Sequence, residues 1–138
     1  MYTFGVKSTT VLGTLHEDLQ VLMKEVLKYK NVSLLEGYRP NERQQQLLDE
    51  GKTKVGPGKS KHNLYPSEAV DQIPYPFSEK DWEDRDKFHL HAGFVLGVAA
   101  RLKGEGKMSR DVRWGGDWDK DWGASDNEFD DFPHIELL

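Results

Sequence analysis

The chain has 138 residues, a formal net charge of −5 and no cysteine. This length suits one compact domain over residues 1–138 and leaves no room for a second, targeting domain. The lack of cysteine excludes disulfides and thiolate-bound metals, and the acidic balance argues against a nucleic-acid partner. Neither a secretory signal nor an apolar stretch of membrane-spanning length is visible, so we expect synthesis in a cytoplasm and no membrane insertion.

Hydrophobic periodicity and turn residues predict a mixed order of helices and strands. The first helix has apolar residues at i, i+3, i+4 and i+7 spacing, and Thr14 with Glu17 forms a capping box at its start. No repeat or linker divides the chain, and the order predicts an α+β fold with helices packed on a small antiparallel sheet. In chain order we expect a helix over 15–29, a strand over 32–39, a helix from Pro40-Asn41 to Asp49, a loop over 51–60, a strand over 69–73, a helix over 82–103, and strands over 111–114 and 133–138.

Two histidines and two aspartates form the most informative pattern. His62 follows a loop rich in Gly and Lys, Asp71 lies in an expected strand, and His134 begins the last one. Two imidazoles and one carboxylate suffice to hold a catalytic zinc whose fourth position is left to water. Asp131, three residues before His134, is then available to move a proton, provided that Pro133 forces a turn that brings the two side chains together. Spacing alone leaves a metal site and ordinary structural residues as alternatives.

The remaining histidines are weaker candidates. His89 and His91 are two residues apart on an expected helix, so they point about 200° apart and cannot share one metal. We expect His91 in the core and His89 on the surface. His16 stands at a helix N-terminus with no evident partner.

The acidic segment from Asp117 to Asp131 carries seven carboxylates and one lysine. Such a run is usually a solvated loop. Asp117, Asp119, Asp121 and Glu128 match positions 1, 3, 5 and 12 of a calcium loop, but the glycine required at position 6 is missing. An EF-hand is therefore not expected, and a looser Ca²⁺ site stays open. Three tryptophans in and before this segment are expected either to line a cleft or to be buried: Trp114, Trp118 and Trp122.

Several motifs together resemble the zinc peptidoglycan peptidases of the D-alanyl-D-alanine carboxypeptidase (LAS) group, and most closely the phage L-alanyl-D-glutamate endopeptidases. The matching motifs cover most of the chain in the family order. They are Phe4-Gly5, His16-x-Asp18-Leu19, Gly37-Tyr38-Arg39, Ser60-Lys61-His62, Ala69-Val70-Asp71, Trp114-Gly115-Gly116-Asp117-Trp118 and Asp131-Phe132-Pro133-His134-Ile135-Glu136.

The resemblance implies a Hedgehog/DD-peptidase-like fold and an endolysin that hydrolyses the L-Ala–D-Glu bond of peptidoglycan stem peptides. It further implies a monomer without a wall-binding domain, which waits in the host cytoplasm and then acts on the cell wall during lysis. Each matching residue receives a role by the same resemblance. Zn²⁺ is held by His62, Asp71 and His134, Asp131 is the acid/base, Arg39 stabilises the oxyanion and contacts substrate, and Ser60 binds substrate or orients a ligand.

Two departures from the family pattern are visible. His62 and Asp71 are separated by nine residues rather than the commoner seven, which a loop can absorb. Asp131 stands where several relatives carry Glu, so its shorter side chain must lie closer to the reacting water. The alternatives are a D-Ala-D-Ala carboxypeptidase or dipeptidase, and a non-catalytic zinc-containing binding module of the same fold. A non-haem iron oxygenase also uses two His and one carboxylate, but typically with a closer His–Asp spacing.

Overall fold

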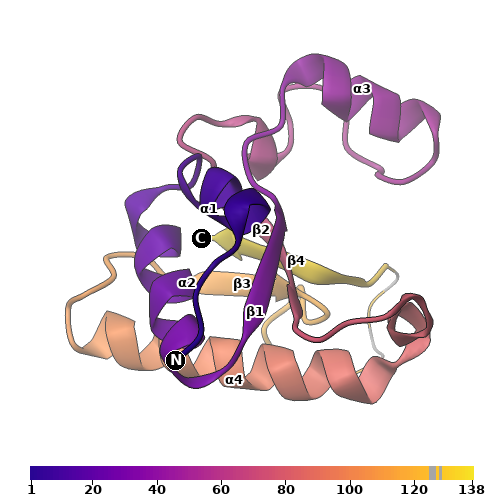
Figure 1. Ribbon diagram of the computed structural model, residues 1–138. Helices are drawn as coiled ribbons and strands as arrows, with labels where there is room; N and C mark the ends of the chain where they lie inside the picture. Colours follow the sequence, from indigo (N-terminus) through magenta and orange to yellow (C-terminus); the bar gives the residue numbers. More distant parts are fainter. Residues whose placement is uncertain (125–126, 128) are drawn as a thin grey trace.

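The computed structural model describes residues 1–124, 127 and 129–138. In this part of the chain, a four-stranded antiparallel sheet of order β1-β2-β4-β3 lies at the centre, with helices around it (Figure 1). The expected α+β fold is confirmed. The α-helices are α1 (Val6–Leu12), α2 (Glu17–Tyr29), α3 (Asn41–Asp49) and α4 (Arg85–Gly104), the short 3-10 helices are η1 (Lys61–Asn63) and η2 (Glu79–Glu83), and the strands are β1 (Val32–Glu36), β2 (Ala69–Pro74), β3 (Val112–Gly115) and β4 (Asp131–Leu137).

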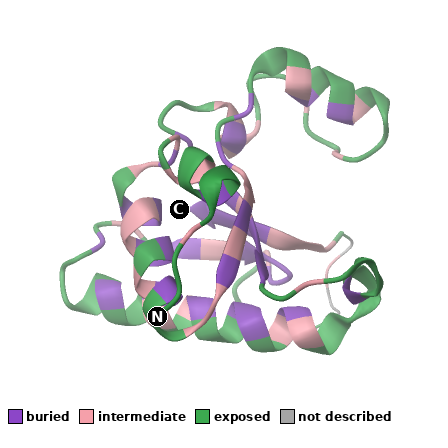
Figure 2. Ribbon diagram, in the orientation of Figure 1, coloured by how far each residue is buried: buried purple, intermediate pink, exposed green. Residues whose placement is uncertain are grey.

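The two faces of the sheet have different neighbours. Successive side chains of a strand point to opposite faces, and Val70, Ile135 and Trp114 on one face join the core that α2 and α4 cover. Burial accordingly follows the strands and the inner sides of these helices, whereas most of α3 is exposed (Figure 2). Asp71, which follows Val70 in β2, and Arg113, which precedes Trp114 in β3, therefore belong to the opposite face. That face is free to form a site.

The start of α2 differs from the expected capping box. The helix begins at Glu17, and its N-cap is His16, whose Nδ1 accepts the backbone N–H of Asp18. The Thr14 hydroxyl instead donates to the carbonyl of Val11. The prediction placed the cap two residues too early, because Thr has a strong N-cap preference whereas the imidazole of His16 serves as the acceptor here.

Other boundaries also differ from those expected. Helix α1 was not predicted; its seven residues are too few for a clear helical periodicity. The long helix begins at Arg85 rather than Trp82, because Asp84 caps it by accepting the Lys87 N–H, and η2 precedes it. Strand β1 ends at Glu36, so residues 37–39 leave the sheet.

In the described part of the chain, no helix has both the length and the apolar composition needed to cross a membrane.

Strand β4 contains a bulge where a turn was expected. Its pairing with β3 passes from Trp114–Ile135 directly to Gly115–Asp131, so residues 132–134 bulge out of register. Asp131 is thus the first residue of β4 rather than part of a preceding turn. Gly115 permits this approach, since a Cβ on it would lie 2.9 Å from the carbonyl carbon of Asp131. The bulge, helped by Pro133, places two residues that are three apart on the same side.

Candidate active site

Asp71 and His134 are direct neighbours across two strands. They pair in the antiparallel register of β2 with β4, which places their side chains next to each other on the face away from the core. The Nδ1 atom of His134 lies 3.4 Å from Oδ1 of Asp71. The sheet therefore holds two of the expected ligands in a fixed relation.

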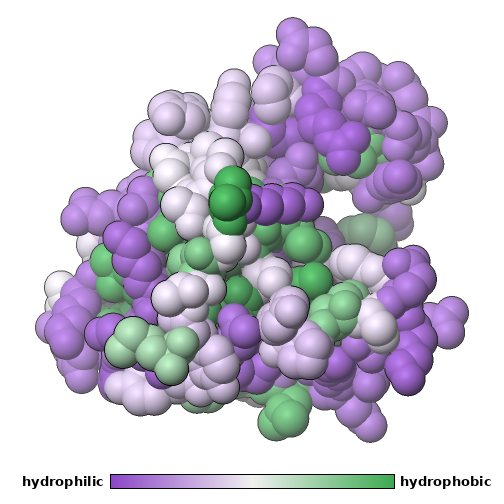
Figure 3. Space-filling view, viewed as in Figure 1, coloured by the Kyte–Doolittle hydropathy of each residue, from purple (hydrophilic) through white to green (hydrophobic). Residues whose placement is uncertain are grey.

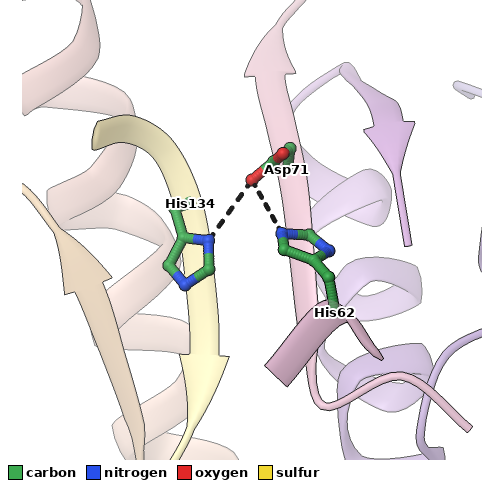
Figure 4. A group of neighbouring side chains, drawn as sticks. All are labelled: His62, Asp71 and His134. Atoms are coloured by element: carbon green, nitrogen blue, oxygen red, sulfur yellow. Dashed lines mark hydrogen bonds and ion pairs between the residues drawn. The ribbon is translucent and has the colours of Figure 1, made fainter. Parts of the chain in front are cut away.

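His62 joins them from η1, beside the sheet. The Ser60 hydroxyl caps this short helix by accepting the backbone N–H of His62. The ring Nδ1 donates to the carbonyl of Gly37 at 2.7 Å, and Nε2 lies 3.2 Å from Oδ1 of Asp71. The three side chains point toward one another (Figure 4). Gly37 must be glycine, because a Cβ there would lie 2.7 Å from a methyl group of Leu15.

The donor atoms of these three residues fit a metal ion. One atom from each of His62, Asp71 and His134 lies within 4.8 Å of the others. A tetrahedral ion with bonds of about 2.0–2.1 Å separates its ligand atoms by about 3.3 Å, close to the 3.2 and 3.4 Å observed. The outer nitrogen of His62 donates to the Gly37 carbonyl and that of His134 to Glu136 at 2.8 Å. With a metal bound, the inner nitrogens would therefore be the ones to present lone pairs to the shared point, as in metal-binding histidines.

The charges around this point favour a cation. Burial alone would raise the pKa of Asp71, but His62 and His134 hold it well below its usual range. Burial opposes a charge on His134, yet hydrogen bonds to Asp71 and Glu136 raise the pKa of its imidazole to about 9. The pKa of Glu136 falls to about 2, because its hydrogen bonds to His134 and Arg113 outweigh the effect of burial. A site that binds a proton this firmly also suits a divalent cation.

Asp131 lies at the edge of the same group. Its Oδ2 is 4.0 Å from Nδ1 of His134, and its side chain is partly exposed. Burial first, and then the negative charge of Asp71, raise the pKa of the Asp131 carboxyl. A carboxylate whose pKa is shifted toward neutrality is suited to accept and return a proton.

Arg39 is buried beside Asp71 and His62, not exposed as an ordinary surface arginine would be. Its Nε and Nη2 both donate to Oε1 of Glu36, its Nη1 donates to Gln44, and Nη2 lies 3.4 Å from Oδ2 of Asp71. Its backbone N–H donates to the carbonyl of His62 at 2.7 Å. The segments that carry Arg39 and His62 are thus joined directly.

The side chains of His62, Asp71, His134, Asp131 and Arg39 line one cleft of about 1130 Å³. One wall is the hydrophilic lobe formed by α3 and residues 50–60, which borders a hollow in the surface (Figure 3). Trp118 lines the other side, with its ring centroid 5.5 Å from that of His134. Although the chain is acidic, the lobe and the segment after it bring several basic side chains to the cleft: Arg43, Lys52, Lys54, Lys59 and Lys61.

Comparisons with known proteins agree with this geometry. The family described as phage L-alanyl-D-glutamate peptidase matches residues 1–138. The chain belongs to this family. Among solved structures, it is similar to the L-Ala D-Glu endopeptidase ChiX of Serratia marcescens, with 26% identity over 98% of this chain and 89% of that one and a TM-score of 0.71. Among curated proteins, none is similar enough to count as a match.

Some residues of this peptidase were not found from the sequence. Glu36 and Gln44 hydrogen-bond to Arg39, and Glu136 to His134. Glu36 and Gln44 belong to no quoted motif, and Glu136 ends the last motif but received no role. One available signal for Glu136 was its place two residues after His134, which puts both on the same face of a strand. For Gln44 the sequence shows only a run of three glutamines in a helix.

The other candidate residues lie outside the ligand group. His91 is buried, as expected, and hydrogen-bonds to Gln72. His89 is half-buried rather than on the surface, with its ring against Trp114 and Phe132. Of the three expected tryptophans, Trp114 is buried in the core, Trp118 lines the cleft, and Trp122 is 74% exposed.

The acidic loop gathers three of its carboxylates. Asp117, Asp119 and Asp121 offer oxygens that lie within 4.8 Å of one another, and Asp117 accepts the backbone N–H of Trp122. Glu128, the last residue of the calcium pattern, lies outside the described residues. Exposed acidic groups commonly lie this close without an ion, so calcium binding here stays a prediction.

Proposed function

We propose that this peptidase is a zinc enzyme that hydrolyses the L-Ala–D-Glu bond of peptidoglycan stem peptides. The observation that supports it most directly is the convergence of His62, Asp71 and His134 beside Asp131, inside a cleft of about 1130 Å³. Two imidazoles and a carboxylate match the donor set of catalytic zinc sites, which keep one position open. When bound, zinc supplies a Lewis acid that activates water near neutral pH and polarises a peptide carbonyl.

The side chains around the ligands perform the remaining steps. Asp131 accepts the proton of the attacking water and then gives it to the leaving amine, so that the amine departs uncharged. Arg39 places its guanidinium at the cleft beside Asp71, where it stabilises the negative charge that develops on the carbonyl oxygen. Ser60 orients His62 through its cap, and its place in the cleft wall also allows it to contact substrate.

The charge of the cleft fits the same substrate. A stem peptide in which D-Glu is linked through its side chain keeps a free carboxylate next to the scissile bond. Basic side chains of the lobe attract such an anion and raise its rate of association. All donor atoms and Asp131 come from one chain, so a monomer holds a whole site. We propose that it acts on the cell wall after release from the host cytoplasm.

Metal analysis and digestion of purified stem peptides test the proposal together. We expect about one zinc per chain, and mass spectrometry should find new termini at L-Ala and D-Glu. Release of D-Ala instead would support the carboxypeptidase alternative. Asp131→Asn should lower kcat by about 10²–10⁴-fold while zinc stays bound. His134→Ala should lose both the bound zinc and the peptidase activity. Asp130→Asn is the matched control, because Asp130 lies in an ion pair with Arg85 and should keep its activity.

A further inference from the structure

Gln44 is a buried polar residue of α3, whose other buried residue is the apolar Leu47. Its exposed fraction is 0%, whereas the next two residues of α3, Gln45 and Gln46, are exposed. The amide groups of Gln45 and Gln46 donate to Asp49 and Glu50, one turn along the same helix. Only the first of three identical neighbours faces the interior, so its amide has a role that the other two lack.

The hydrogen bonds of Gln44 join the cleft wall to Arg39. Its Oε1 accepts Nη1 of Arg39 at 2.9 Å, and its Nε2 donates to the carbonyl of Val55 at 2.6 Å and lies 3.5 Å from the hydroxyl of Thr53. Arginine can only donate, and a carbonyl can only accept, so the orientation of the amide is determined. One side chain therefore contacts both the guanidinium and the loop of the lobe.

The guanidinium needs this second contact to hold its plane. Glu36 takes the edge formed by Nε and Nη2, which leaves Nη1 to Gln44. With both edges bound, the plane is fixed and Nη2 faces Asp71.

We propose that Gln44 is a positioning residue that acts through Arg39, and that it couples the cleft-wall loop at residues 53–55 to the group that stabilises the transition state. This inference rests on the role of Arg39 in the proposed function. Because misplaced donors lose most of their effect, Gln44→Met lowers kcat by about 10- to 100-fold. The KM and the zinc content stay close to those of the wild type.

The test is a double-mutant cycle of Gln44→Met with Arg39→Ala, assayed on stem peptides. If Gln44 acts through Arg39, the change at Gln44 alters kcat by less than about twofold once Arg39 is absent. The ¹H–¹⁵N signal of the Arg39 Nε group, which reports a fixed guanidinium, should broaden or shift in Gln44→Met. Gln45→Met is the matched control, since it removes a bond only within α3, and it should leave both kcat and this signal unchanged.

Gln44→Glu distinguishes positioning from simple anchoring of the lobe. A carboxylate still accepts from Arg39 but can no longer donate to Val55, so positioning predicts a higher kcat for Gln44→Glu than for Gln44→Met. Anchoring predicts the reverse order, because neither variant donates to the Val55 carbonyl and the carboxylate also repels that oxygen, whereas the methionine side chain does not. The inference is overturned by that reverse order, by an equal loss in both Arg39 backgrounds, or by an unchanged kcat in Gln44→Met. If instead the wild-type protein releases no L-Ala terminus, the proposed function has failed, and the Arg39 signal still reports whether Gln44 holds the guanidinium.

Discussion

Replacement of Gly115 by alanine tests how the fold places Asp131. A Cβ at position 115 would overlap the carbonyl oxygen of Asp131 and would lie 2.9 Å from its carbonyl carbon and 3.0 Å from its Cβ. Carbon atoms in favourable contact are about 3.5–4.0 Å apart, so β3 and β4 must separate by roughly half an ångström to relieve the carbon contacts, and by more to relieve the overlap with the oxygen. All three atoms belong to the residue that we propose as the acid/base. The substitution therefore disturbs its position without changing its chemistry.

The size of the effect follows from the overlap. Crowding of this kind in a packed site costs about 1–3 kcal/mol, which in a domain of this size lowers Tm by about 4–10 °C. A displacement approaching 1 Å in a reacting group costs up to about 10²-fold in rate. We therefore expect Gly115→Ala to keep zinc, to melt earlier and to lose about 10- to 100-fold in kcat. Calorimetry, metal analysis and peptide hydrolysis measure the three quantities.

Gly97→Ala provides a control in which the expected change in Tm has the opposite sign. Gly97 lies inside α4, and a Cβ there meets nothing within 4 Å. Alanine in a helix interior stabilises by about 0.5–1 kcal/mol relative to glycine, so this variant should melt later with unchanged kcat. Wild-type kcat and Tm in Gly115→Ala would refute the close approach of β3 to Asp131 as the feature that positions this carboxylate.

Two further predictions concern buried groups near the site. Glu136→Gln removes the charge behind His134 and should weaken zinc affinity by about 10- to 100-fold; an unchanged Kd in chelator competition would contradict this. Burial, and secondarily Lys30, lower the pKa of His91 to about 3. His91 is therefore neutral when folded but takes up a proton below about pH 6.5 when unfolded, which costs about 2 kcal/mol of stability between pH 7 and pH 5 and continues toward pH 3. Denaturant unfolding of His91→Gln should not show this loss of stability at low pH. If the free energy of unfolding falls equally with pH in the wild type and in His91→Gln, the proposed effect of His91 is wrong.

The ligand types could be predicted from the sequence, but their supports could not. His62, Asp71 and His134 are metal-binding residue types in recognisable motifs, and the structure brings them together. Glu136 and Gln44 are ordinary polar residues until strand pairing and the fold of the lobe show what they contact. Their roles depend on contacts between segments far apart in the sequence, which residue type and periodicity do not contain.

The ends of the helices and strands also divide into those that the sequence could predict and those that depend on contacts between distant segments. The apolar spacing of α2 and α4 gave their positions within a few residues, because a buried stripe must repeat with the helical period. Strand β4 was expected from Pro133 onward, whereas it begins at Asp131. Hydrophobic pattern could not reveal this, since the bulge at residues 132–134 depends on the absence of a side chain at Gly115 in the partner strand.

The site combines a rigid sheet with two segments that are bound to each other. Asp71, Asp131 and His134 come from paired strands, whereas Arg39 and His62 arrive from outside the sheet. Three hydrogen bonds join those two segments: the Arg39 N–H to the His62 carbonyl, the Asn63 amide to the Arg39 carbonyl, and His62 Nδ1 to the Gly37 carbonyl. The guanidinium that we propose for the oxyanion is therefore tied to one of the proposed metal ligands. Because the lobe contacts Arg39 through Gln44 and His62 through Ser60, a displacement of the cleft wall would reach both residues directly.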